Sequence, residues 1–278
     1  MAELQDMLDF IKKILEERQE TTNTFKRNLI KEYFQVLILS FLYSHKKYQD
    51  LVFYGGSCLR HCFNLPRVSE DLDFVDIKGK TNFENLGSDL KKYFEKNLGL
   101  KIGLKIQKFR IYLKFPILYK LDLAKRSESE FLFLKIEIFH RFGFCKKYRI
   151  EILPLFKFGE SVLIRTFDLS TLMATKIRAI LYRKWERTNK KGEILAKVKG
   201  RDYYDLMWYL EKGIEPNLKC IEGVKSKIEL KERLLEIVKK VDPRSVKYDL
   251  EGLIEDTNFI EDLGNNIKRI LDRQLKQF

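Results

Sequence analysis

The sequence predicts an α+β protein, in which a mixed sheet flanked by helices is followed by an all-helical C-terminal part. Two observations support this fold class. Between residues 51 and 167 most apolar residues form short runs of strand length, whereas after residue 170 they recur with a helical period. The chain has 278 residues, and its 45% hydrophobic content is enough for a substantial core. We therefore expect two domains, residues 1–168 and 169–278, with the boundary near Thr166–Ser170.

The first part is expected to open with two helices that flank the sheet. Apolar residues recur with a helical period from about Ala2 to Glu17, and a polar break at residues 21–24 can cap a second helix that runs to about Tyr43. A further amphipathic helix is expected from about Asn82 to Asn97. The strands are expected over Leu51–Tyr54, Asp71–Phe74, Leu100–Leu113, Phe131–Phe139, Tyr148–Leu153 and Ser161–Phe167.

The second part is expected to contain helices only. Ser170 can cap a helix that runs through Leu181, and another helix begins near Gly200. The remaining two helices are expected over about Ser226–Lys240 and Glu255–Lys276, on either side of a turn at Asp242-Pro243.

The composition restricts the partners and the surroundings of the protein. A formal net charge of +14 suggests an anionic partner such as nucleic acid or a nucleotide, although a lysine-rich composition explains it equally well. No apolar stretch approaches the roughly 18–20 residues that span a bilayer. No signal peptide is visible, so we expect a soluble, cytoplasmic protein without a membrane partner. Four scattered cysteines and three isolated histidines do not indicate a disulfide framework or a histidine-based metal site.

An acidic pair is the first candidate for chemistry. Asp71 and Asp73 lie two residues apart, so on a strand both carboxylates project from the same face. Adjacent carboxylates repel each other unless a cation neutralises them, and Mg²⁺ prefers such oxygens together with substrate phosphates. Glu137, which shares a face with Lys135 in an alternating strand, is the best candidate for the third ligand of a two-metal site. The alternative is an ordinary solvated strand.

A glycine turn precedes the acidic pair. Gly55-Gly56-Ser57 follows the strand that ends at Tyr54 and opens a short helix. Glycines at such a turn let the backbone approach a ligand, and the start of the helix offers amides and a hydroxyl to phosphate oxygens. No G-x-x-x-x-G-K-[ST] sequence is present, so this is not the usual P-loop. The alternative is a plain strand-to-helix turn.

The two features together resemble a known pattern. G-G-S-x-L-R followed by R-x-S-x-D-x-D is similar to the nucleotidyltransferase fold of the DNA polymerase β superfamily and, more narrowly, to the AbiEii/AbiGii-type toxin family. The resemblance implies a nucleotidyltransferase-like sheet, with Asp71 and Asp73 as catalytic metal ligands. It also implies that nucleotide is bound by Gly55, Gly56, Ser57, Arg60, Arg67 and Ser69. The alternatives are that the two arginines pair with Glu70 and that Ser69 caps the strand.

The family pattern continues into the helical part. An A-x-K-[IL]-x-A sequence is matched at residues 174–179, and an [RK]-D-x-x-D-L sequence is matched at residues 201–206. By this resemblance Lys176 is a catalytic residue that contacts the nucleotide triphosphate, and Asp205 or Asp202 supports it. The alternatives are a solvated helix lysine and a helix-start acid favoured by the macrodipole. Glu137 departs from the pattern, because many polymerase-β-like enzymes have aspartate at the third acidic position.

The resemblance also implies a function. It indicates a metal-dependent nucleotidyltransferase that uses two Mg²⁺ ions and transfers NMP from an NTP to an RNA 3′ end, which in some relatives is that of tRNA. Members are toxins of toxin–antitoxin or abortive-infection systems, so an antitoxin partner is expected. Two alternatives stay open: nucleotidyl or phosphoryl transfer to a protein partner, and a non-catalytic RNA-binding module. The candidate RNA contacts, which could equally be a solvated charged surface, are Arg178, Tyr182, Arg183, Lys184, Trp185, Arg187 and residues 190–199.

Overall fold

The computed structural model describes residues 2–140, 142–145, 147–189 and 191–278. The chain forms two compact units. No helix in these described ranges is long and apolar enough to cross a membrane. The first unit comprises Met1–Asn64, Val68–Phe142 and Ile152–Thr166, and the second comprises Leu65–Arg67, Gly143–Glu151 and Phe167–Phe278.

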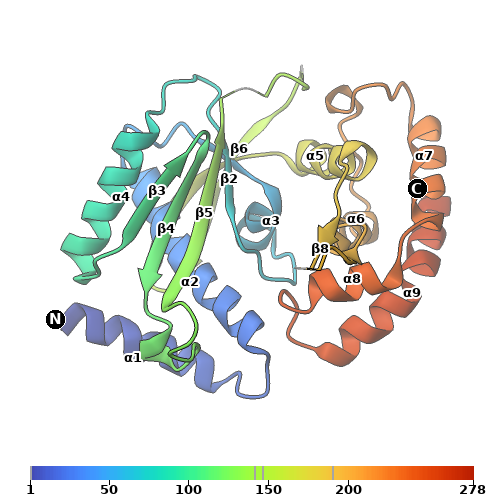
Figure 1. Ribbon diagram of the computed structural model, residues 1–278. Coiled ribbons are helices and arrows are strands. Elements are labelled where there is room, and N and C mark those ends of the chain that lie inside the picture. Colours follow the sequence, from blue (N-terminus) through green and yellow to red (C-terminus); the bar gives the residue numbers. More distant parts are fainter. Residues whose placement is uncertain (1, 141, 146, 190) are drawn as a thin grey trace. The chain divides into compact units, whose positions relative to one another are not determined.

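The first unit is built on a mixed sheet of seven strands in the order β3-β4-β5-β2-β1-β7-β6 (Figure 1). β5 runs parallel to β2, and β1 runs parallel to β7, whereas β2 and β4 are antiparallel to β1 and β5, respectively. β2 therefore lies near the middle of the sheet. The strands are β1 (Val52–Tyr54), β2 (Leu72–Val75), β3 (Gly103–Gln107), β4 (Arg110–Pro116), β5 (Phe131–Phe139), β6 (Ile150–Lys157) and β7 (Glu160–Phe167).

Helices cover one face of this sheet. Phe34 of α2 is fully buried and stacks on Phe115 of β4, with ring centroids 4.1 Å apart. The side chains of the N-cap residues Thr22 and Asn82 each accept a hydrogen bond from a backbone amide in the first turn of the helix. Gly99 ends α4 in the left-handed region at φ +58°. The helical segments of this unit are α1 (Ala2–Glu16), α2 (Asn23–Ser44), α3 (Gly55–Phe63), α4 (Phe83–Leu98) and the short 3₁₀ helix η1 (Tyr119–Leu121) (Figure 1).

The two faces of the sheet differ in polarity. In β5 the side chains of Leu134, Ile136 and Ile138 are fully buried against the helices. Lys135 and Glu137 alternate with them and are only partly buried, so they project from the opposite face. The predicted alternation of this strand is therefore confirmed, and it creates a polar face at the centre of the sheet.

The second unit is helical apart from one short hairpin. Gly200 opens α6 where it packs on α8, and a Cβ at this position would overlap the backbone of Val246. Asp242 caps α8 and Pro243 occupies its first turn. The elements are α5 (Leu169–Tyr182), β8 (Arg187–Thr188), β9 (Ile194–Ala196), α6 (Gly200–Glu211), η2 (Leu218–Cys220), α7 (Lys227–Lys239), α8 (Pro243–Leu250) and α9 (Thr257–Gln277).

Several local predictions are corrected. The run predicted as one strand over residues 100–113 is interrupted at Lys108, whose positive φ of 55° turns the chain between β3 and β4. Ser170 was predicted to cap a helix, but the N-cap is Asp168, two residues earlier, and the helix begins at Leu169. The expected turn at Asp242-Pro243 begins a helix, because proline suits the first helical turn. Cys145 and Cys220 form a disulfide across 75 residues, a separation over which spacing carries no signal.

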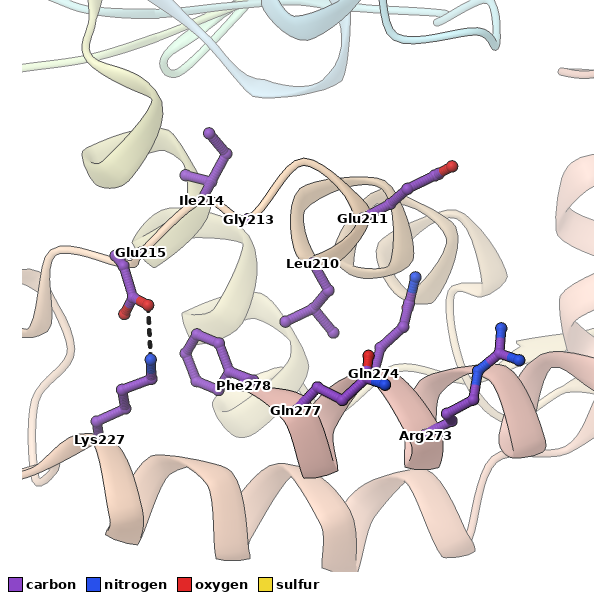
Figure 2. A pocket seen from close by; sticks show the side chains of 10 residues that line it. All are labelled: Leu210, Glu211, Gly213, Ile214, Glu215, Lys227, Arg273, Gln274, Gln277 and Phe278. Atoms are coloured by element: carbon purple, nitrogen blue, oxygen red, sulfur yellow. Dashed lines mark hydrogen bonds and ion pairs between the residues drawn. The ribbon is translucent and has the colours of Figure 1, made fainter.

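A cavity of about 420 Å³ lies in the second unit among α6, α7 and α9 (Figure 2). Lys227 Nζ lies 2.6 Å from Glu215 Oε1 and 4.3 Å from the centroid of the Phe278 ring. These charges at the cavity wall are thus already paired with each other. None of the residues that the sequence predicts for the site lines this cavity.

Candidate active site

Three acidic side chains lie on the polar face of the sheet in the first unit. Asp73 of β2 pairs in register with Glu137 of the parallel strand β5, so both carboxylates project from the same side. Asp71 stands just before β2, and its carboxylate meets the ammonium group of Lys135 on that face. The exposed side-chain fractions of Asp71 and Glu137 are 33% and 14%. The acids predicted as metal ligands therefore share one solvent-accessible face.

Lys135 joins two of these acids. Its Nζ lies 2.9 Å from Asp71 Oδ2 and 3.0 Å from Glu137 Oε1, and Arg110 Nε lies 2.6 Å from the same Glu137 oxygen. Burial alone would lower the pKa of Lys135, but the two carboxylates outweigh it and raise that pKa. Burial raises the pKa of Asp71, which Lys135 only partly offsets. Burial also opposes ionisation of Glu137, but Lys135 and Arg110 outweigh it and lower its pKa.

The glycine turn brings the start of α3 against the acids. Gly55 has a φ of +81°, and a Cβ at this position would overlap Asp73 Oδ2. The N-cap residue Tyr54 makes no side-chain capping hydrogen bond to α3. The Tyr54 side chain therefore does not satisfy the first-turn amides of α3, and amides at a helix start suit an anionic group.

Two side chains hold the acidic segment in place. Ser57 is fully buried, and its hydroxyl donates a hydrogen bond to the backbone carbonyl of Asp71. Gln35 Nε2 donates to the backbone carbonyl of Ser69 at 2.9 Å. The sequence predicted that Ser57 binds nucleotide, whereas its hydroxyl proton is engaged by Asp71 in the structure. The Ser57 side chain thus positions the acidic segment.

The acids have the chemistry of a metal site but do not form a complete one. In the part of the chain that the structure describes, no three His, Cys, Asp or Glu side chains are grouped closely enough to hold a metal ion. Asp71 and Asp73 present carboxylate oxygens, which hard divalent cations prefer. Glu137 is already engaged by Lys135 and Arg110. The residues therefore fit a cation held by the two aspartates, and the metal role of Glu137 stays a prediction.

The other predicted residues form a buried cluster of charges in the second unit. Lys176 of α5 has its Nζ 2.9 Å from Asp202 Oδ1 and 2.8 Å from Asp205 Oδ2, both on α6. Arg67 forms a bidentate pair with Asp205, with both bonds at 2.7 Å. Arg183 Nη1 lies 3.0 Å from Asp202 Oδ2. Each aspartate therefore connects Lys176 to an arginine, so both acids support the lysine.

This cluster keeps Lys176 charged in a buried place. Burial alone would lower the pKa of Lys176, but Asp202 and Asp205 outweigh it and raise that pKa. Burial would raise the pKa of Asp202, and Lys176 and Arg183 outweigh it and lower that pKa. Three cations share two carboxylates, so the cluster carries an excess positive charge. An anion would compensate that excess.

Two arginines that were predicted to bind nucleotide are engaged with acids of their own unit. Arg60 Nε lies 3.1 Å from Oε1 of the buried Glu32. The Arg67 side chain is 1% exposed and bonded to Asp205. Ser69 is also buried. The nucleotide-binding roles of these residues stay predictions, and the contacts describe a structural role for each arginine.

Comparison with known proteins identifies the family. A family model described as the nucleotidyl transferase AbiEii toxin of type IV toxin–antitoxin systems matches residues 40–276. The chain belongs to this family. The AbiEii protein is therefore a nucleotidyltransferase, and all of its predicted site residues fall within the matched range. No curated protein matches the chain.

Two solved structures resemble the AbiEii fold at a distance. One is JHP933 from Helicobacter pylori, and the other is described as a candidate nucleotidyltransferase from the same organism. Each is 18% identical to this chain over 90% of its length, with a TM-score of 0.47. The match covers 94% and 96% of those chains, respectively. Membership of the family rests on the sequence match alone.

Three side chains of the AbiEii site were not predicted as site residues. Lys135 carried a signal, because it alternates with Glu137 and so shares its face. Arg110 carried none, since it reaches Glu137 from a neighbouring strand 27 residues away. Gln35 likewise reaches Ser69 from α2, 34 residues earlier. Contacts of this kind become visible only when strand order and helix packing are known.

Proposed function

We propose that this AbiEii protein transfers NMP from an NTP to the 3′ end of an RNA, with tRNA as the acceptor, in a reaction that depends on a divalent cation. One observation carries the proposal. Asp71, Asp73 and Glu137 share one face of the sheet, and the start of α3, which the Tyr54 side chain does not cap, lies against Asp73 at Gly55. Carboxylates for a cation and amides for phosphates thus occur together.

Asp71 and Asp73 would hold Mg²⁺, with two ions as the expected number. When bound, Mg²⁺ supplies positive charge to the substrate phosphates and lowers the pKa of the attacking hydroxyl. Glu137, kept anionic by Lys135 and Arg110, would orient the RNA 3′ hydroxyl. The hydroxyl oxygen would form a bond to the α-phosphorus as its proton passes to solvent, the bond from the α-phosphorus to the bridging oxygen of the β-phosphate would break, and pyrophosphate would leave with that oxygen.

The phosphates of the NTP would be held by backbone and by lysine. The amides at Gly55 and Gly56 would donate to phosphate oxygens, and Ser57 would keep the acidic segment in register through its bond to Asp71. Lys176, oriented by Asp202 and Asp205, would neutralise charge on the leaving pyrophosphate. The excess positive charge of its cluster supports this role.

A basic patch in the second unit supports an RNA acceptor. Arg183, Lys197 and Lys199 line a cavity of about 40 Å³ together with Trp185, and Lys199 Nζ lies 5.7 Å from the centroid of the Trp185 ring. Burial and the nearby Arg201 lower the pKa of Lys199, so a phosphate would relieve the repulsion there. Among the other predicted RNA contacts, Lys190 and the side chain of Arg187 lie outside the described residues.

The family also indicates the biological setting. Because the matching family consists of type IV toxins, we expect this protein to act as a toxin in a toxin–antitoxin or abortive-infection system. An antitoxin encoded with it would then oppose its effect. Expression of the toxin alone should arrest growth, and an Asp71→Asn variant should not.

Transfer of label tests the reaction. The full chain is incubated with Mg²⁺, total RNA and each NTP labelled in turn on the α- or the γ-phosphate. Label from the α-phosphate in a discrete small-RNA band is expected, and none from the γ-phosphate. Label found only in protein, or transfer from the γ-phosphate, would show that the acceptor or the reaction class is wrong.

A further inference from the structure

A second basic cavity lies in the second unit and has no role in the reaction described above. Its volume is about 300 Å³. Three of its lining residues carry a positive charge, against one carboxylate, that of Asp168. The lining residues are Lys147, Tyr148, Arg149, Asp168, Asn217 and Lys219.

The cations of this cavity need an anion. Lys147 and Lys219 are exposed and have no acidic partner among the described residues. Arg149 is 78% exposed, and its only acidic neighbour in the described chain is Glu151, at a long 3.8 Å. Three like charges around one cavity repel each other, and a phosphate group would compensate them with charge-assisted hydrogen bonds.

The cavity also contains an acceptor without a donor. Asp168 Oδ1 is buried and has no hydrogen-bond partner among the described residues. Although Asp168 is the N-cap of α5, its side chain makes no capping bond. A buried carboxylate oxygen without a donor is costly, so this position favours a ligand that donates a hydrogen bond. A phosphate alone cannot do so.

The walls are held rigidly enough to form a site. Asn217 Nδ2 donates to the backbone carbonyl of Lys147 at 2.7 Å and to Thr171 Oγ1 at 3.2 Å. The backbone amide of Asp168 donates to the carbonyl of Arg149 at 3.1 Å. The segment that carries Lys147 and Arg149 is thereby fixed to α5 and to the loop before η2.

We infer that this cavity binds one ribose-phosphate unit of the RNA acceptor, with the phosphate on Lys147, Arg149 and Lys219 and the ribose 2′-hydroxyl donating to the Asp168 carboxylate. The inference rests on the proposed RNA acceptor. A ribonucleotide carries both an anionic phosphate and a 2′-hydroxyl donor on the same sugar-phosphate unit, whereas DNA lacks the 2′-hydroxyl. The cavity therefore both anchors the acceptor and distinguishes RNA from DNA.

Binding without turnover tests the cavity. Fluorescence anisotropy of the full chain with labelled single-stranded RNA and DNA of the same sequence, in the absence of NTP, should show tighter binding of RNA. Lys147→Gln/Lys219→Gln should weaken binding of both strands and reduce the slope of log K against log salt by about 0.7, the value for one phosphate. The matched control Lys225→Gln/Lys240→Gln removes two exposed lysines outside the cavity lining and should leave the slope nearly unchanged.

The hydroxyl contact has a test of its own. Asp168→Ala should lower RNA affinity by about tenfold while DNA affinity is unchanged or rises, since a hydrogen bond to a charged group is lost only with RNA. Because Asp168 caps no amide with its side chain, the melting temperature should stay within a few degrees of wild type. An unchanged RNA-to-DNA ratio would overturn the inference, as would equal RNA binding by the cavity and control lysine pairs. The inference would also be overturned if a free NTP displaced RNA while the cavity variants had no effect on RNA binding.

The experiments distinguish an error in the cavity inference from an error in the proposed reaction. If the variants weaken RNA binding as expected while the wild type labels no RNA, the cavity is supported and the transfer reaction is wrong. If the wild type labels RNA while the variants bind RNA as the control does, only the cavity inference is wrong.

Discussion

The acidic face of the first unit and the lysine cluster of the second unit carry opposite excess charges and differ in burial. On the sheet, Asp71 and Glu137 share the cation Lys135, Arg110 also pairs with Glu137, and these side chains remain partly exposed. In the helical unit, three cations share two carboxylates and are mostly buried, with Asp205 at 0% exposure. The first arrangement can accept a further cation, and the second can accept a further anion.

The largest expected effect comes from breaking the buried pair of the helical unit. Among the described residues, Arg67→Met leaves the buried Asp205 with Lys176 as its remaining ion-pair partner. Removing one partner of a buried ion pair typically costs about 3–5 kcal/mol. We expect a loss of this size in the free energy of unfolding, measured by urea denaturation.

Two further variants sharpen this test. Arg67→Met/Asp205→Leu removes both charges and should recover much of the lost stability, because no buried carboxylate is then left without its bidentate arginine. Lys227→Met breaks the exposed pair with Glu215 and should cost no more than about 1 kcal/mol. Equal losses for Arg67→Met and Lys227→Met would contradict the buried character of the cluster.

The next largest effect concerns activity and comes from the partly exposed acidic face of the first unit. Asp71→Asn and Asp73→Asn should each reduce nucleotide transfer by about 10²–10³-fold, the range found when a preorganised electrostatic group is lost. Folding should be preserved, because the change relieves repulsion between carboxylates. Glu70→Gln, an acid on the same segment, is the matched control and should retain activity within a few-fold. Full RNA labelling by either aspartate variant would show that the catalytic assignment is wrong.

The two regions also differ in how far the sequence predicts them. The acids could be predicted because a two-residue spacing on a strand places side chains on one face, and Glu137 alternates in its own strand. The hydrogen bond from Ser57 to the Asp71 carbonyl and the ion pair of Arg67 with Asp205 could not be predicted. The partner of Ser57 depends on how α3 folds back on β2, and the partner of Arg67 lies 138 residues away. Local periodicity carries no information about either contact.

The first unit also contains a buried hydrogen bond between His61 and Gln35, and the burial of His61 should make the stability of the protein depend on pH. Burial lowers the pKa of His61 to about 3, although Glu32 opposes this shift. The ring is therefore neutral, and its Nε2 lies 3.0 Å from Gln35 Oε1. In the unfolded chain the imidazole takes up a proton near pH 6.5, so the unfolded state binds more protons between about pH 6.5 and 3. Stability should consequently fall as the pH is lowered through this window.

The size of this effect can be checked against two variants. Between pH 7.5 and pH 5, protonation of the unfolded His61 should cost about 2 kcal/mol of unfolding free energy. His61→Gln removes the titrating group and should flatten the pH dependence by that amount. His45→Gln changes an exposed histidine and should not alter the slope. If wild type and His61→Gln lose stability in parallel, the imidazole is not buried in its neutral form.

The smallest expected effect concerns Lys135, which is the cation of the acidic face. Its ammonium lies between Asp71 and Glu137 and competes electrostatically with any metal ion bound there. Lys135→Met should therefore tighten Mn²⁺ binding, measured by electron paramagnetic resonance, by about tenfold, or about 1.4 kcal/mol. Lys114→Met, on the same face of the adjacent strand β4, should leave the affinity unchanged. Weaker metal binding by Lys135→Met would mean that the lysine holds the carboxylates in the geometry that the metal needs. The excess negative charge of this face would then matter less than its shape.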